Sequence, residues 1–197
     1  MSNEKWAKYH MERAEHAATK SKDTTKVGAA LVGPEDESLL SAYNGPPRGV
    51  LDKPERFERP AKYLFASHAE ANLIAFAARA GIRTKGCTVF VTHHPCAHCA
   101  KALIQAGISC VVYGPGTTSM PAEEFEAAAI MFDEARVALQ PLHQTHHMVQ
   151  PGETIARLSF KYNIHWSEIW AKNIELIGPN IYPSPDAIFI GERLRIR

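Results

Sequence analysis

Hydrophobic and polar positions alternate along the first part of the chain in a way that predicts helices and strands in turn. Residues 3–20 place Trp6, Tyr9 and several alanines among charged residues, which is the spacing of an amphipathic helix. Apolar runs at 27–32 and 39–44, separated by the polar turn GPEDES, predict a β-hairpin. The later pattern predicts helices at 67–80, 95–106 and 121–134, and strands at 87–92, 109–114 and 136–140.

The order of these elements indicates the fold class. Helices that alternate with buried strands favour a three-layer α/β/α domain built on a mixed five-stranded sheet. Residues 142–147 have little periodicity, and we expect a linker between a domain at 1–141 and a second, small domain at 148–197. In this second domain the pattern predicts a β-α-α-β unit, with helices at 154–162 and 166–172 and a last strand at 192–196.

Composition and charge restrict the classes of function. The chain has 197 residues, of which 45% are hydrophobic, and 22 basic side chains face 21 acidic ones, for a net charge of +1. Proteins that bind nucleic-acid backbones usually carry a clear basic excess, so nucleic acid is not the expected partner. No apolar run approaches the roughly 18 residues that would span a bilayer, and the first residues are charged throughout. We therefore expect a cytoplasmic protein with no membrane partner.

The stretch THHPCAHCAK, residues 92–101, places two of the four cysteines three positions apart. Pro95 is suited to the first turn of a helix, and Cys96 and Cys99 would then share one helix face. The positive end of the helix dipole favours the thiolate form that binds metals. An isolated C-x-x-C pair is equally compatible with two ordinary helix cysteines or with a redox pair, so a partner motif is needed to decide.

The stretch SHAE, residues 67–70, supplies that partner. If both helices begin at the same edge of the sheet, His68 joins Cys96 and Cys99 as a third ligand. Because the sequence indicates no fourth protein ligand, a position stays open for water, as in catalytic zinc sites. The alternative for Glu70 is structural, since Ser67 and Glu70 fit the capping box S-x-x-E. Capping leaves the histidine and the cysteines without an explanation, so we expect one catalytic Zn²⁺.

The combination of HAE with PCAHC resembles the signature of the zinc-dependent cytidine and deoxycytidylate deaminase superfamily. This resemblance implies a cytidine deaminase-like fold for residues 1–141, with His68, Cys96 and Cys99 as zinc ligands. It also implies that Glu70 is the catalytic residue. In the superfamily the equivalent glutamate takes a proton from the zinc-bound water and delivers protons to the pyrimidine N3 and to the departing ammonia.

The flanking segments indicate the substrate. The segments AYNGPPRG (42–49) and KYLFASHAEANLIAFAARAG (62–81) resemble deoxycytidylate (dCMP) deaminases, especially those carried by tailed phages. The implied reaction is the hydrolytic deamination of dCMP to dUMP, which supplies thymidylate synthesis. Two alternatives stay open at this point. One is a different cytosine substrate, such as deoxycytidine, dCTP or a single-stranded nucleic acid, and the other is an inactive fold that serves as a glycan-binding or scaffold protein.

The same resemblance implies contacts with the substrate. Asn44 would bind the deoxyribose, the backbone at Ala69 the base carbonyl, and His94 would line the base pocket. Candidates for the phosphate contact are Arg48, Arg59 and Lys62. As an alternative, NGPPRG is a plain turn, and Arg56, Arg59 and Lys62 lie on a solvated helix face.

The remaining histidines and cysteines have structural predictions. His93 is expected at the end of a strand, His98 on the solvent side of a helix, and Cys87 and Cys110 in buried strands. Relatives in the superfamily are commonly homohexamers that dCTP activates and dTTP inhibits. We therefore expect a homo-oligomer with dCTP and Mg²⁺ as an effector, in the host cytoplasm if the chain is phage-encoded.

Residues 148–197 resemble a LysM domain, because VQPGETI (149–155) fits the opening V-x-x-G-[DE]-T-[LI] of that family. The resemblance implies binding of peptidoglycan or another N-acetylglucosamine polymer through two loops. The candidate contacts are Gly152, Glu153, Thr154, Ile155 and Ile188. The alternative is an assembly or purely structural role, since a chain without a secretion signal does not meet extracellular glycan.

Overall fold

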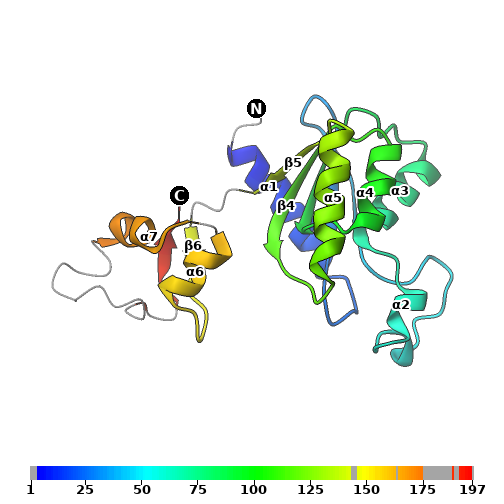
Figure 1. The fold of residues 1–197 in the computed structure, drawn as a ribbon. Helices are drawn as coiled ribbons and strands as arrows, with labels where there is room; N and C mark the ends of the chain where they lie inside the picture. Colours follow the sequence, from blue (N-terminus) through cyan, green and yellow to red (C-terminus); the bar gives the residue numbers. More distant parts are fainter. Residues whose placement is uncertain (1–3, 143–145, 163, 175–187, 189–190, 197) are drawn as a thin grey trace. The chain divides into compact units, whose positions relative to one another are not determined.

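The computed structural model describes residues 4–142, 146–162, 164–174, 188 and 191–196 (Figure 1). The chain divides into two compact units, residues 1–142 and residues 143–197. Strand β6 (His146–Met148) begins inside the segment expected to be a linker, because His146 and His147 pair with Arg195 and Leu194 of the last strand.

The N-terminal unit is built on a mixed five-stranded sheet with the strand order β2-β1-β3-β4-β5. Strand β1 pairs antiparallel with β2 and β3, whereas β3, β4 and β5 run parallel. The elements of this unit are α1 (Glu4–Ala18), β1 (Gly28–Val32), β2 (Ser38–Tyr43), η1 (Pro54–Arg56), α2 (Lys62–Phe65), α3 (Ala69–Ala80), β3 (Thr88–His93), α4 (Ala97–Gln105), β4 (Cys110–Gly116), α5 (Ala122–Glu134) and β5 (Ala138–Pro141).

Helices cover both faces of this sheet, so the predicted three-layer α/β/α fold is confirmed (Figure 1). Successive residues of a strand point to opposite faces. Leu31 and Val89 therefore pack with α3, α4 and α5, whereas Val32 and Phe90 pack against α1. The close approach of α1 depends on Gly28, since a Cβ atom there would lie 1.9 Å from the backbone oxygen of Ala14.

Two predictions about the elements are wrong in detail. The 3₁₀-helix η1 and the short helix α2 lie in a segment that the sequence pattern left without regular structure. Helix α4 begins at Ala97 with Cys96 as its N-cap residue, so Pro95 precedes the cap instead of lying in the first turn. All predicted strands of the sheet are present, and α3 ends where Gly81 adopts the left-handed conformation.

The C-terminal unit has the predicted β-α-α-β order: β6, α6 (Ile155–Tyr162), α7 (Trp166–Lys172) and β7 (Arg193–Arg195), with β6 and β7 antiparallel. Its core lies between the helices and the two strands and contains Val149, Ile155, Leu158, Ile169, Ile188, Leu194 and Ile196.

None of the helices that the structure describes has the length and apolar character needed to cross a membrane.

Candidate active site

The first turns of α3 and α4 bring together one nitrogen and two sulfur atoms from distant parts of the sequence. His68 is the N-cap residue of α3, and Cys96 is the N-cap residue of α4. His68 Nδ1 lies 3.5 Å from Cys96 Sγ and 3.3 Å from Cys99 Sγ. Within the described ranges these three side chains form a group able to hold a metal ion, with all ligand atoms within 4.8 Å of one another.

The spacing of these donor atoms fits a tetrahedral zinc ion. Zinc–sulfur bonds of ~2.3 Å and zinc–nitrogen bonds of ~2.0–2.1 Å, at tetrahedral angles, separate a nitrogen from a sulfur by about 3.6 Å. The two observed nitrogen–sulfur distances, 3.5 and 3.3 Å, are close to this value. The residues present therefore fit a zinc ion with three protein ligands.

Hydrogen bonds among these three side chains shift their pKa values. The hydrogen bond from Cys99, followed by that from His68, lowers the pKa of Cys96 to about 3. The pKa of Cys99 is raised because its thiol hydrogen-bonds to Cys96 and is buried. The hydrogen bond to Cys96 also raises the pKa of His68. The lowered pKa of Cys96 favours its thiolate form, the form in which a cysteine would bind a metal ion.

Glu70 lies in the first turn of α3 beside this group and is only 4% exposed. Burial raises the pKa of its carboxyl group. The capping-box alternative for Glu70 is wrong, because His68 and not Ser67 occupies the N-cap position and α3 has no side-chain cap. The carboxyl group is therefore available for chemistry in the same pocket as the candidate ligands.

A cavity of about 130 Å³ opens onto these residues. Its walls come from the segment before β1, the end of β2, the region around α2, the first turn of α3, the end of β3 and the loop after β4. Among the predicted substrate contacts, its lining includes Asn44, Arg59, Lys62, Ala69 and His94. Arg48 does not line this cavity.

The side chain of Asn44 is already hydrogen-bonded within the protein. Its Oδ1 accepts from the backbone N–H of Val27 at 2.8 Å, and its Nδ2 donates to the backbone oxygen of Thr25 at 2.9 Å. The amide therefore ties the end of β2 to the start of β1, so Asn44 holds one wall of the cavity in place.

The three candidate phosphate contacts have different surroundings. Lys62 is buried, and its Nζ lies 2.7 Å from Oδ1 of the equally buried Asp23, so the alternative of a solvated helix face is wrong for Lys62. Arg48 lies over the ring of Phe76, 4.7 Å from its centroid. Arg59 is exposed and donates to Ser119 Oγ at 2.8 Å.

The histidines around the site differ in their surroundings. His94 contacts the rings of Tyr113 and Phe125, at centroid distances of 4.5 and 5.4 Å, and burial lowers its pKa. His93 ends β3 as predicted and also lines the cavity. His98 is exposed on α4, as expected. His94 is therefore a neutral ring on the cavity wall.

The sequence pattern did not indicate that two acidic residues, Asp23 and Glu124, contact residues of this site. Asp23 partners Lys62 from 39 positions away, and Glu124 of α5 accepts a hydrogen bond from the backbone N–H of Ala97 at 3.2 Å. Asp23 is a single acidic residue in a polar stretch, and Glu124 is one of three glutamates at the start of α5, so no local pattern distinguishes either from solvated charges. The burial of Cys87 is confirmed, whereas Cys110 is only half-buried.

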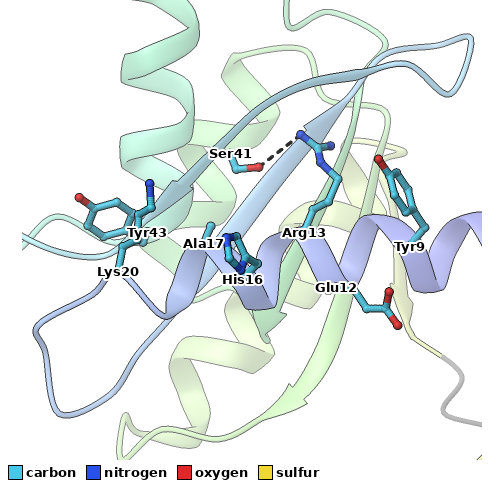
Figure 2. A pocket seen from close by; sticks show the side chains of 8 residues that line it. All are labelled: Tyr9, Glu12, Arg13, His16, Ala17, Lys20, Ser41 and Tyr43. Carbon is cyan, nitrogen blue, oxygen red and sulfur yellow. Dashed lines mark hydrogen bonds between the residues drawn. The ribbon is translucent and has the colours of Figure 1, made fainter.

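A second cavity, of about 360 Å³, lies between α1 and β2 (Figure 2). In Figure 2 the side chain of Arg13 reaches from α1 toward β2, where its Nη2 donates to Ser41 Oγ at 3.4 Å, while Tyr9 and Tyr43 flank the two ends. Neither Glu70 nor a candidate metal ligand lines this cavity. The candidate metal ligands and Glu70 therefore belong to the smaller cavity.

The residues predicted to bind glycan have structural contacts in the C-terminal unit. Ile155 and Ile188 are buried in its core. Thr154 Oγ1 accepts from the backbone N–H of Arg157, and Gly152 has a φ of 79°. Glu153 Oε2 lies 2.5 Å from Nε2 of His147. The rest of the second predicted binding loop, residues 186–187 and 189–190, lies outside the described residues.

Residues 4–115 match the family described as the cytidine and deoxycytidylate deaminase zinc-binding region, and residues 147–197 match the LysM domain. The chain belongs to the cytidine and deoxycytidylate deaminase family. An uncharacterised deaminase of Aliivibrio fischeri is 39% identical over 137 residues, which cover 68% of this chain and 90% of that protein. Deoxycytidylate deaminase of Mus musculus is 36% identical over 142 residues, covering 68% of this chain and 78% of the mouse protein.

Solved structures agree with this membership of the deaminase family. The dCMP deaminase of the cyanophage S-TIM5, in its apo form, superposes with a TM-score of 0.56 at 26% sequence identity. The match covers 70% of this chain and 97% of the phage protein. The cytidine deaminase-like fold expected for the N-terminal domain is thus confirmed.

Proposed function

We propose that this protein catalyses the zinc-dependent hydrolytic deamination of dCMP to dUMP and ammonia. The observation that carries the proposal is the group of His68, Cys96 and Cys99 at two helix starts, with the buried carboxyl group of Glu70 in the same cavity. The similarity to deoxycytidylate deaminases over two thirds of the chain supports dCMP over other cytosine compounds.

The candidate metal ligands and Glu70 have separate roles in the proposed reaction. His68, Cys96 and Cys99 would hold the zinc ion, and when bound the ion would supply a water molecule acidified enough to act as nucleophile near neutral pH. Glu70 would take one proton from the attacking water and give it to N3 as the oxygen bonds to C4 of the cytosine. It would then take the second proton from that oxygen and give it to the amino group, which leaves as ammonia as the C4–N bond breaks. The raised pKa of Glu70 suits it to both steps, because a proton carrier works best when its pKa approaches the working pH.

The remaining walls of the cavity position the base and the sugar. We propose that the backbone at Ala69 binds the base carbonyl and that the neutral ring of His94 contacts one side of the base. Asn44 binds the deoxyribose. All three line the cavity. Because the Asn44 amide is bonded on both sides to the protein, it presents a fixed edge to the sugar.

Arg59 is the phosphate contact that the surroundings favour among the three candidates. The charge of Lys62 is neutralised by Asp23, and Arg48 is absent from the cavity lining. Arg59 lines the cavity, is exposed, and has the neutral hydroxyl of Ser119 as its hydrogen-bond partner. A guanidinium group can bind two phosphate oxygens at once.

Substitution of Arg59 tests this assignment. A hydrogen bond to a charged group contributes about 1.5–3 kcal/mol. Arg59→Gln should therefore raise the KM for dCMP by roughly 10- to 100-fold and leave turnover of deoxycytidine unchanged. Arg48→Gln serves as the matched control. An unchanged KM for dCMP in Arg59→Gln would show that another residue binds the phosphate.

The experiment for the main proposal compares ammonia release from dCMP, deoxycytidine, dCTP and CMP by the purified protein, with Glu70→Gln as the inactive control. Selective turnover of dCMP supports the proposal. Turnover of single-stranded, cytosine-containing nucleic acid instead would favour the polynucleotide alternative, and a zinc-loaded protein inactive on all substrates would favour a binding or scaffold role.

Regulation and assembly follow from the same family resemblance. We propose a homo-oligomer, a hexamer, that dCTP activates with Mg²⁺, and a location in the cytoplasm where its nucleotide substrate occurs. The similarity to a cyanophage enzyme supports a phage-type deaminase acting in the host cytoplasm. Sedimentation with and without dCTP and Mg²⁺, combined with the activity assay, tests both the assembly and the effector.

For the C-terminal unit, the match of residues 147–197 to the LysM domain supports binding of a glycan with N-acetylglucosamine units, such as peptidoglycan. Gly152, Glu153 and Thr154 are the assigned contacts on the first loop. A pull-down on purified peptidoglycan tests the assignment. If no protein is retained, an assembly or structural role for this unit is favoured.

A further inference from the structure

Helix α4, which carries two of the three candidate zinc ligands, has no cap of its own. The first N–H groups of a helix have no partner within the helix, and a side chain at the N-cap position usually accepts from one of them. In α4 that position is Cys96, which makes no side-chain cap, and the first turn contains no acidic residue. The sulfur of Cys96 is instead directed to His68.

The missing acceptor comes from the neighbouring helix. Helix α5 packs beside α4 (Figure 1). Glu124, in the first turn of α5, accepts a hydrogen bond from the N–H of Ala97, the first residue of α4, at 3.2 Å. The half-buried carboxylate of Glu124 therefore lies at the positive end of the α4 dipole, where a negative charge is stabilising.

The next residue of α5 contacts the same segment. The ring of Phe125 meets the ring of His94, which lies two residues before Cys96, at a centroid distance of 5.4 Å. Two adjacent residues of α5 thus hold the chain on either side of Cys96. A movement of this segment would displace both sulfur ligands together, since Cys96 and Cys99 lie within one turn of the same helix.

We propose that Glu124 is a positioning residue for the zinc site, which it serves by capping α4 from outside. The inference rests on the proposed zinc ligands but not on the identity of the substrate. Partners that orient metal ligands typically change metal affinity by 10- to 100-fold when they are removed. The same loss is expected here for Glu124→Ala.

Three variants separate this role from general effects of charge. Glu124→Gln keeps an oxygen acceptor without the charge and should rescue zinc binding to near the wild-type level. Glu123→Ala is the matched control, because Glu123 is exposed in the same first turn of α5. Glu124→Asp shortens the side chain by one methylene group, which moves the carboxylate away from α4, and should give an intermediate zinc affinity.

The measurement is zinc affinity by competition with a chromophoric chelator, together with the visible spectrum of the cobalt-substituted protein, both without substrate. Glu124→Ala should bind zinc roughly 10- to 100-fold more weakly and shift the cobalt bands that report sulfur ligation. Wild-type affinity and an unchanged cobalt spectrum in Glu124→Ala would overturn the proposal. If circular dichroism shows that Glu124→Ala is unfolded, the same measurement on Glu124→Asp decides, and wild-type behaviour there overturns it. Because no substrate is present, failure of the dCMP assay does not affect this outcome.

Discussion

Glu70 is a buried ionisable residue at the point where the proposed reaction needs a proton carrier. Its carboxyl group has a raised pKa because burial disfavours the charged form. In solution such a group would be almost fully ionised at neutral pH. In this pocket the energies of the two protonation states are closer together, so the group can both accept and release a proton within one turnover.

Glu70→Gln should lower kcat by at least roughly 10²–10⁴-fold, the usual contribution of general acid–base catalysis, because an amide cannot carry the proton. Zinc content should stay at the wild-type level, since Glu70 is not a member of the ligand group. Activity assays paired with metal analysis check both parts. A variant that loses zinc together with activity would contradict the assigned role.

His10 is a second buried ionisable residue, on the opposite face of the sheet from the site. It is 1% exposed and packs against Phe90. Neither ring nitrogen has a hydrogen-bond partner among the residues that the structure describes. Burial lowers its pKa, outweighing Asp36 at 3.6 Å, while nearby Arg13 lowers it further. His10 is therefore neutral in the folded state.

This lowered pKa predicts a loss of stability in acid. The unfolded chain binds a proton at His10 below about pH 6.5, whereas the folded chain resists it. The contribution of neutral His10 to stability is therefore fully present above pH 6.5. It is lost as the pH decreases from 6.5 toward the lower pKa of His10 in the folded state. His10→Leu should reduce the difference between the Tm values at pH 7.5 and pH 5.5.

The control for this prediction is His16→Leu, an exposed histidine on the same helix, which should keep the wild-type difference. Part of the slope should remain in His10→Leu, because burial also lowers the pKa values of His93 and His94. Identical pH dependence in wild type and His10→Leu would show that His10 does not contribute.

Between elements, the buried ion pair of Asp23 and Lys62 fixes the segment before β1 to α2. Asp23 also accepts from the backbone N–H of Thr25 at 2.8 Å, and its own N–H donates to Ser21 Oγ at 3.2 Å. Ser21 Oγ in turn donates to the backbone oxygen of Asn44. One network thus holds together three walls of the catalytic cavity.

Lys62→Met should lower the free energy of unfolding by about 3–5 kcal/mol, because it leaves the carboxylate of Asp23 buried and unpaired. Urea unfolding measures the loss. The matched control is Lys22→Met, which breaks an exposed pair with Asp52 and should cost less than about 1 kcal/mol. The double variant Lys62→Met with Asp23→Asn should recover part of the loss, and equal losses for both lysine variants would contradict the buried-pair interpretation.

The sequence pattern predicted the strands and long helices because each carries its own apolar periodicity. It did not predict α2, whose four residues are too few to show a period. It began the helix at Pro95, two residues before the observed start at Ala97, because a proline is equally compatible with the residue before the cap. The motif predicted that the candidate zinc ligands lie together, as they do. The burial of Lys62 depends instead on Asp23, a partner that no local pattern indicates.

At the scale of the molecule, we propose that the domains expected at 1–141 and 148–197 are separate, with β6 extending the second one back to His146. The cores support this division, since the described core residues of one unit all precede residue 143 and those of the other all follow residue 146. We expect two unfolding transitions in calorimetry.

Removal of zinc by a strong chelator should lower the Tm of the deaminase transition alone. A ligand that binds only the folded state stabilises it, by roughly 4 kcal/mol when its concentration is a thousand times the Kd. The proposed ligands lie in the N-terminal unit, so the C-terminal transition should not move. Calorimetry with and without chelator checks this, and a joint shift of both transitions would contradict independent domains.

The separation of the cores also bears on the history of the gene. The described core residues of the N-terminal unit come from one continuous stretch of the chain, and those of the C-terminal unit come from the stretch that follows. A recombination event that attached or removed the segment after residue 142 would therefore leave those clusters intact. Such a junction would allow the C-terminal unit to be added or removed without rebuilding the core of the deaminase unit.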